Sequence, residues 1–337
     1  MVKRVTIKDV ATEAGVSVTS VSIVLNGKGM SVPLSTRERI FAAAEKLHYT
    51  PNYTARSLVM GKTNMVGIIV PSITNSFFAE LVRLLQNQFA KYGYDIVLSN
   101  NEDSAENDLK YIRLLSGRNI DGLIFTPSSE SLYEDKTEKL RKTIDKLSIP
   151  CLFLDRYFGD YPHISVDNTS SSYALADYLV RRGHKKIGVV TGPMRLNSSA
   201  NRLKGLQKRL LEEGIELPDS YVYEGNYDIE TGEKAAARFL QTDVTAIFAF
   251  SDMQAYGVYK KLKELGKKVP EDISVVGFDD NVYSALLDKP LTTMRQPLEE
   301  IATATVKTML EMMRGKGYEK TDKIPATLIE RESVKQL

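Results

Sequence analysis

The sequence is poor in the residues that build covalent or metal-bound sites. It has one cysteine, Cys151, among 337 residues, and its three histidines lie far apart in the chain. A single cysteine excludes an intramolecular disulfide and a cysteine metal cluster. The histidines lack the close spacing of an HExxH-type site, so we expect no protein metal site and no cofactor.

Long apolar runs and enzyme fingerprints are also missing. No stretch of about 18 consecutive apolar residues occurs, so we expect no transmembrane helix. The N-terminal residues MVKRVTIKDVATEAG have no apolar core of signal-peptide length, which favours a cytoplasmic protein. Neither a GxSxG nucleophile elbow nor a glycine-rich dinucleotide fingerprint occurs, so we expect no catalytic residues and no enzyme.

Charge is distributed unevenly along the chain. Residues 1–62 contain nine Lys and Arg against four Asp and Glu, a net charge of +5, whereas the remainder has 36 against 39, a net of −3. A basic N-terminal segment on a mildly acidic body favours a nucleic-acid-binding module joined to a second unit. The alternative is a basic face that is merely solvated.

The first fifty residues have the pattern of three short helices. Thr6 can cap the first, Gly15 supplies a turn, and Ser17 can cap a second helix that runs to about residue 26. A third helix is expected to begin near residue 35 or 36. A small core is expected to form from Ile40, Phe41, Ala44 and Leu47. Two helices joined by a short glycine-containing turn predict a helix-turn-helix, whose second helix lies in the major groove.

Two motifs here, TIKDVATEAGVSVTSVSIVLNG and YTPNYTARSL, resemble the head and hinge of the LacI/GalR family of bacterial transcription regulators. Leu58 matches the hinge leucine that family members insert into the minor groove, where it would unstack a base step and kink the duplex. The resemblance implies base reading by Val18, Thr19 and Ile23, and phosphate contacts by Ser17, Ser22 and Asn26. The expected DNA-contacting set is completed by Thr6, Tyr53 and Arg56.

Ile23 is the least typical of the three expected base readers. Relatives commonly carry Arg or His at this position, and either can hydrogen-bond to guanine. Isoleucine has no donor, and the apolar group that the major groove offers is the thymine methyl. The alternative is that Ile23 turns inward or meets its own subunit.

The remaining residues alternate between apolar runs and helical patterns in two series. The continuous apolar runs predict strands buried on both faces, hence parallel sheets covered by helices. The first series has strands at 65–70, 94–99, 121–126 and 150–155. The second begins near residue 164, with strands at 164–166, 186–192, 221–225, 246–251 and 273–279. The tail adds a helix at about 298–313 and a strand at about 324–330.

These patterns predict a small all-α helix-turn-helix head and an α/β body of two parallel-sheet lobes, which resembles the periplasmic-binding-protein architecture. The family resemblance implies that the tail returns to both lobes. The expected divisions are residues 1–50 for the head, 51–63 for the hinge, 64–160 with about 292–321 for the N-terminal lobe, and 161–291 with about 322–337 for the C-terminal lobe.

Ligands of open parallel sheets sit beyond the carboxyl ends of the strands, so residues that follow strands are candidates for a binding site. Here they combine aromatic rings with carboxylates, arginines and amides, which suit the C–H faces and hydroxyls of a sugar. Taken singly, each could instead be a core, capping or surface-pair residue. The expected effector-binding set is Asn75, Phe77, Phe78, Thr126, Asp155, Arg156, Arg202, Tyr227, Ser251, Asp279 and Gln296.

The motifs NSFF, LDR and GFD, together with Arg202 and Tyr227, resemble the ligand contacts of pentose- and hexose-binding members of this superfamily. The purine-binding branch resembles NSFF and GFD too, but it usually lacks Arg after the LD aspartate. We therefore expect a dimeric or tetrameric repressor that binds double-stranded operator DNA and a sugar-like effector, with no membrane partner. A nucleobase or nucleoside effector, a phosphorylated protein coregulator and a sugar-converting enzyme are the alternatives.

Overall fold

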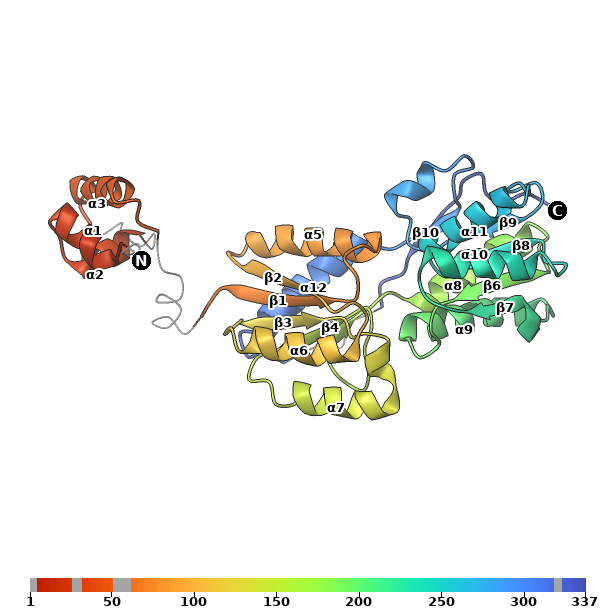
Figure 1. Cartoon of the computed structure of the whole chain (residues 1–337), viewed down its shortest axis with the longest axis horizontal. Coiled ribbons are helices and arrows are strands. Elements are labelled where there is room, and N and C mark those ends of the chain that lie inside the picture. The colour runs from red at the N-terminus through yellow and green to blue at the C-terminus, as the bar shows by residue number, and fades with distance from the viewer. Residues whose placement is uncertain (1–4, 26–31, 51–61, 318–322) are drawn as a thin grey trace. The chain divides into compact units, whose positions relative to one another are not determined.

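The computed structural model describes residues 5–25, 32–50, 62–317 and 323–337 (Figure 1). The chain divides into two compact units, Met1–Thr63 and Asn64–Leu337, here called the head and the body. Among the described residues, no helix combines the length and the apolar character that crossing a membrane requires.

The head folds into helices α1 (Ile7–Ala14), α2 (Val18–Leu25) and α3 (Leu34–Lys46). Thr6 begins α1 with a capping box, in which its backbone N–H and its hydroxyl both donate to Asp9, each at 2.7 Å. Gly15 ends α1 in the left-handed region at φ 62°, as a tight turn requires. The Ser17 hydroxyl accepts from the Ser20 backbone at 3.1 Å and so caps α2. These starts and stops confirm the helix-turn-helix.

Helix α3 begins at Leu34, directly after Pro33 and close to the expected start, but its core residues differ from expectation. Phe41 is 53% exposed and does not belong to the small core, which contains Ile40 and Ala43 from this helix. Adjacent helical residues lie about 100° apart, so Ile40 and Phe41 cannot both face the same core.

The first lobe of the body, here the N-lobe, is built on a parallel sheet with the strand order β2-β1-β3-β4-β5. Its strands are β1 (Met65–Val70), β2 (Asp95–Asn100), β3 (Gly122–Phe125), β4 (Cys151–Leu154) and β5 (His163–Ile164). Helices α5 (Ser76–Ala90) and α12 (Leu298–Met312) pack on one face. Helices α6 (Ala105–Ser116) and α7 (Glu134–Ile144) pack on the other, and the short helix η2 (Glu130–Leu132) precedes α7.

The second lobe, here the C-lobe, has a parallel sheet with the order β7-β6-β8-β9. Its strands are β6 (Ile187–Thr191), β7 (Val222–Glu224), β8 (Ala246–Ala249) and β9 (Ser274–Val276). Helices α8 (Asn168–Arg181) and α9 (Asn197–Glu212) cover one face, and α10 (Ile229–Phe239) and α11 (Asp252–Glu264) cover the other. Gly205 allows α9 to approach α8 closely, because an added Cβ would lie 2.1 Å from the Thr169 carbonyl oxygen.

The tail of the chain contributes to both lobes (Figure 1). Helix α12 packs against α5 in the N-lobe core, whereas β11 (Thr327–Ile329) pairs antiparallel with β10 (Thr293–Arg295) beside the C-lobe core. Short helices η3 (Asp219–Tyr221) and η4 (Val282–Ala285) complete the described elements. The expectation that the second series begins near residue 164 is wrong, because β5 pairs with β4 in the first sheet.

Candidate functional site

The outward surface of α2 carries the expected base readers. Val18 is 40% exposed, Thr19 is exposed and Ile23 is half-buried, whereas Val21 and Val24 face the head core. Ile23 is thus neither a core residue like its two valine neighbours nor fully open to solvent. Its contact with DNA stays a prediction.

The polar residues of the head that are expected to contact DNA differ in the hydrogen bonds they make within the head. The hydroxyls of Thr6 and Ser17 make capping hydrogen bonds within the head, and Ser22 is half-buried on α2. A hydroxyl can still accept from or donate to a phosphate while it caps a helix, because it has two lone pairs and one proton. The expected contacts of Asn26, Tyr53, Arg56 and Leu58 fall outside the described residues.

Ten of the eleven expected effector-binding residues line one pocket between the lobes of the body, of about 30 Å³. They come from strand ends and helix starts: Asn75 caps α5, Ser251 caps α11, and Asp155 closely follows β4. Parallel strands direct their carboxyl ends to one edge of each sheet, and the two edges meet here. The lining set is Asn75, Phe77, Phe78, Asp155, Arg156, Ser198, Arg202, Tyr227, Ser251, Asp279 and Gln296.

Thr126 is the exception among the expected residues, and its assignment to the pocket is wrong. Its side chain is fully buried, and its hydroxyl donates to the Leu154 carbonyl at 2.9 Å. The hydroxyl therefore ties β3 to β4 instead of facing a ligand.

Two carboxyl groups stand on opposite sides of the pocket in unusual backbone conformations. Asp155 has a φ of 63° and Asp279 a φ of 130°, which side-chain-bearing residues rarely adopt and which are typical of functional sites. Burial raises the pKa of Asp279 to about 8, against the opposing effect of Arg202, and burial also raises the pKa of Asp155. A protonated carboxyl can donate as well as accept a hydrogen bond.

The two pocket arginines are both buried but have different partners. Arg156 forms an ion pair with Asp103 at 2.6 Å and also donates to the Pro127 carbonyl at 3.3 Å. Arg202 donates to the Asn168 side chain at 2.8 Å and to the Phe250 carbonyl. Its guanidinium carbon lies 3.6 Å from the centre of the Phe278 ring.

Two buried polar atoms in the pocket wall have no hydrogen-bond partner among the described residues, namely Arg156 Nε and Gln296 Oε1. The Gln296 amide nitrogen meanwhile donates to the Asp279 carboxyl at 2.6 Å. Buried polar atoms in proteins are nearly always paired. Both atoms belong to residues that line the pocket, so they are candidates to pair with a ligand that supplies an acceptor to the first and a donor to the second.

Aromatic rings complete the pocket wall. Phe77 and Phe78 meet edge to face with centroids 4.9 Å apart, and the Tyr227 hydroxyl lies 2.7 Å from Ser199 Oγ and 3.3 Å from Ser198 Oγ. Ser198 lines the pocket but was not expected from the sequence. Its position in the first turn of α9, after the β6 loop, is the signal that could have identified it.

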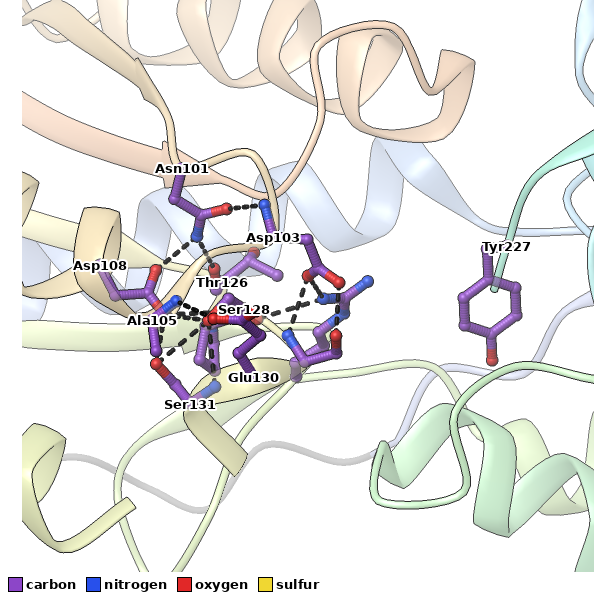
Figure 2. A network of polar contacts seen from close by, with 12 residues as sticks. Asn101, Asp103, Ala105, Asp108, Thr126, Ser128, Glu130, Ser131 and Tyr227 are labelled. Atoms are coloured by element: carbon purple, nitrogen blue, oxygen red, sulfur yellow. Dashed lines mark hydrogen bonds and ion pairs between the residues drawn. The ribbon is translucent and has the colours of Figure 1, made fainter. Parts of the chain in front are cut away.

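A polar network lies behind the N-lobe side of the pocket (Figure 2). Asp103 accepts from the Ser129 backbone at 2.8 Å and from its hydroxyl at 2.5 Å, in addition to its ion pair with Arg156. Burial alone would raise the pKa of Asp103, but Arg156 and Ser129 outweigh that effect and hold it below its usual value. Asp103, which the sequence did not single out, therefore fixes the position of Arg156.

Within the part of the chain that the structure describes, no cluster of three or more His, Cys, Asp or Glu residues is arranged to hold a metal ion.

Comparisons with known proteins agree on the head and the body. Residues 6–52 match the family described as bacterial regulatory proteins, lacI family, and residues 176–334 match the periplasmic binding protein-like domain. The HTH-type transcriptional repressor PurR of Aliivibrio salmonicida is 33% identical over 94% of both chains. Catabolite control protein A of Priestia megaterium is 33% identical over 92% of both.

Solved structures give the same result. The lac repressor dimer bound to operator and the anti-inducer ONPF is 27% identical, with a TM-score of 0.87, over 99% of this chain and 100% of that one. The complex of the transcriptional regulator CelR with cellobiose is also 27% identical, with a TM-score of 0.72, over 98% of this chain and 100% of that one.

Proposed function

The chain belongs to the LacI family of bacterial regulatory proteins, as a DNA-binding transcriptional repressor with an effector-binding domain, and from this premise we propose that a small neutral sugar controls its affinity for operator DNA. The sugar would occupy the pocket between the N-lobe and the C-lobe. By analogy with the lac repressor dimer, two copies of the chain would bind one operator.

The observation that carries the proposal is the distribution of polar groups around the pocket. Asp155 and Arg156 come from the N-lobe, and Arg202 and Asp279 come from the C-lobe. Hydroxyls all around a sugar ring can meet groups on both sides, whereas a flat nucleobase carries its polar atoms in one plane. The buried, unpaired donor at Arg156 Nε and the buried, unpaired acceptor at Gln296 Oε1 would suit hydroxyl groups, which can both accept and donate.

A nucleobase or nucleoside is the second candidate, and similarity to repressors named PurR favours it over a sugar. The residue that argues against it in the sequence is Arg156. In the structure its charge is already neutralised by Asp103 within the N-lobe, so Arg156 does not by itself select a sugar. A phosphorylated protein coregulator is a third candidate, supported by the similarity to catabolite control protein A.

The effector test uses the full chain in a thermal-shift panel of pentoses, hexoses, nucleobases and nucleosides, followed by calorimetry on compounds that raise the melting temperature. We expect a pentose or hexose to bind, and Asp279→Ala to abolish its binding while operator affinity is retained. Leu211→Ala, at a 78% exposed position of α9, is the matched control and should leave binding unchanged. Stabilisation by nucleobases alone, or by none of the panel, would overturn the sugar proposal.

The operator test examines Ile23. Duplexes selected from a random pool by the native chain should favour thymine at the base step that Ile23 contacts, and Ile23→Arg should move the preference there towards guanine. Binding should also weaken steeply with salt, because each phosphate contact releases counterions. An unchanged base preference in Ile23→Arg would show that Ile23 does not read DNA.

A further inference from the structure

A second cavity adjoins the pocket described above. Its volume is about 310 Å³, and it shares Asn75, Phe78, Arg156 and Tyr227 with the inner pocket of about 30 Å³. The two spaces are therefore neighbours that share these four residues. We call them the outer cavity and the inner pocket.

The volumes show that the two spaces have different capacities in this structure. The inner pocket, at about 30 Å³, has room for about one water molecule. The outer cavity, at about 310 Å³, falls at the lower end of the range of small-molecule sites, about 300–1,000 Å³. A ring that enters the inner pocket requires the lobes to adjust, whereas a group attached to that ring finds space already formed outside it.

The outer cavity is lined by hydroxyl groups from the N-lobe and by apolar side chains from the C-lobe. Ser72 and Thr74, from the loop between β1 and α5, place their hydroxyl oxygens 2.9 Å from each other. Pro193, Leu196 and Met253, from the C-lobe, add apolar surface. Hydroxyls opposite apolar side chains suit a second ring with a hydrogen-bonding edge and a C–H face.

The charges of the outer cavity exclude an anionic group. Arg156 is the one cation among the described residues that line it, and Asp103 neutralises it at 2.6 Å. Asp228 adds a further carboxylate, which caps α10 by accepting from the Thr231 backbone at 2.8 Å. A phosphate placed here would meet a net negative lining and no free cation, so Coulomb repulsion and desolvation would both oppose its binding.

We propose that the effector has two units: a ring in the inner pocket and a neutral, hydrogen-bonding second unit in the outer cavity. For a sugar this means a glycoside or disaccharide and not a sugar phosphate. The inference takes from the proposed function that the ring in the inner pocket is a sugar. It adds the size and the charge of the whole ligand.

The test compares three forms of whichever ring binds in the panel: the free ring, its neutral glycoside and its phosphate. For a sugar the glycosides are the methyl glycoside and the disaccharide. Calorimetry on the full chain should show the disaccharide binding at least tenfold more tightly than the free sugar, and the phosphate at least tenfold more weakly. A disaccharide that binds no better than the free sugar would overturn the inference while leaving the sugar proposal intact.

Two substitutions in the wall of the outer cavity sharpen the test. Thr74→Trp fills the cavity from an exposed position, so it should remove the disaccharide's advantage while free-sugar binding is kept. Ser72→Lys supplies the missing cation and should improve binding of the phosphate at least tenfold. Leu211→Trp and Leu211→Lys are matched controls at a position that lines neither space.

These variants separate the two proposals. If no sugar form binds, the proposed function fails. If the free sugar binds but Thr74→Trp leaves the disaccharide's affinity unchanged, the second unit does not occupy the outer cavity and the inference fails.

Discussion

The N-lobe and the C-lobe share one structural feature, a buried aspartate that accepts hydrogen bonds from a neighbouring loop. Each has a fully buried aspartate in the first turn of a helix that follows a strand, Asp108 in α6 and Asp252 in α11. Asp108 accepts from the Ser128 backbone and from the hydroxyls of Ser128 and Ser131, at 2.6–2.9 Å. Such a carboxyl joins the start of its helix to the loop of a neighbouring strand.

The C-lobe aspartate has an equivalent set of donors. Asp252 accepts from the Asn281 backbone at 3.0 Å and from the hydroxyls of Ser284 and Thr293 at 2.5 and 2.6 Å. Burial raises the pKa of both carboxyls, although the hydrogen bonds oppose it. Asp252 therefore holds the loop that bears Asp279, whereas Asp108 holds the loop after β3, whose Ser129 bonds to Asp103. The lobes also differ in how they hold their arginines.

That difference assigns different roles to the two sides of the pocket. Arg156 in the N-lobe is neutralised by Asp103, whereas the polar contacts of Arg202 in the C-lobe are to a neutral amide and a carbonyl. The Arg202 charge opposes the rise in the pKa of Asp279, and the Arg156 charge, although paired with Asp103, opposes the rise in the pKa of Asp155. We expect the C-lobe side to respond more strongly to the polarity of the effector.

The largest expected effect on stability comes from removing the buried aspartate that the two lobes share. Asp108→Ala and Asp252→Ala each remove the acceptor of at least three hydrogen bonds, so each should lower the free energy of unfolding by about 3–5 kcal/mol. Urea titration measures the loss. Asp108→Asn keeps one acceptor oxygen and should lose less than Asp108→Ala. A loss below about 1 kcal/mol in one lobe only would show that the two networks are not equivalent.

The sequence was most informative where burial alone determines the element. The runs MVGIIV and CLFL predict β1 and β4, because a strand covered on both faces must be apolar at every position. Strands β5 and β10 have two and three residues, too few to show a period, and their partners depend on which strands lie beside them. The structure therefore moves residues 163–164 into the first sheet.

The same reasoning explains what was found and missed in the pocket. Asp155 and Asp279 follow apolar strands, so their place at the sheet edge could be expected from strand direction alone. Asp103 follows β2 and Arg156 follows β4, and β1 and β3 lie between these strands, so their ion pair depends on a strand order and a loop path that are not visible in one sequence. Thr126 follows a strand too, but its hydroxyl donates to the Leu154 carbonyl at the end of β4, and this orientation depends on tertiary packing.

The second prediction tests the arginine difference. Arg156→Met leaves Asp103 unpaired and should lower the free energy of unfolding by about 2 kcal/mol, less than for a fully buried pair, because the Asp103 side chain is 40% exposed. Arg202→Met loses hydrogen bonds to neutral groups only and should cost about 1 kcal/mol. The double variant Asp103→Asn with Arg156→Met should recover part of the first loss. The reverse order of costs would contradict the comparison.

The third prediction concerns the contact between the lobes. Arg195, in the loop before α9, donates from Nε to the Ser129 carbonyl at 2.8 Å and lies 3.9 Å from the centre of the Tyr133 ring. Arg195→Ala should lower the free energy of unfolding by about 1 kcal/mol and enlarge the radius of gyration in solution scattering. Arg181→Ala, which breaks an exposed pair with Asp177, is the control and should leave that radius unchanged.

The last prediction is a change in the pH dependence of stability. Folding raises the pKa of Asp279 from 3.8 to about 8, so between these values the folded state binds more protons than the unfolded state. Stability should therefore fall as the pH rises through this window, with the loss complete above about pH 8. Melting temperatures of Asp279→Asn between about pH 5 and pH 8 should show a shallower decline than those of the native chain. Asp155→Asn should act in the same direction, because burial raises the pKa of Asp155 too. If only one of the two substitutions makes the decline of melting temperature with pH shallower, the two pocket carboxyls differ in protonation. The similarity between the lobes would then be limited to the hydrogen bonds of Asp108 and Asp252.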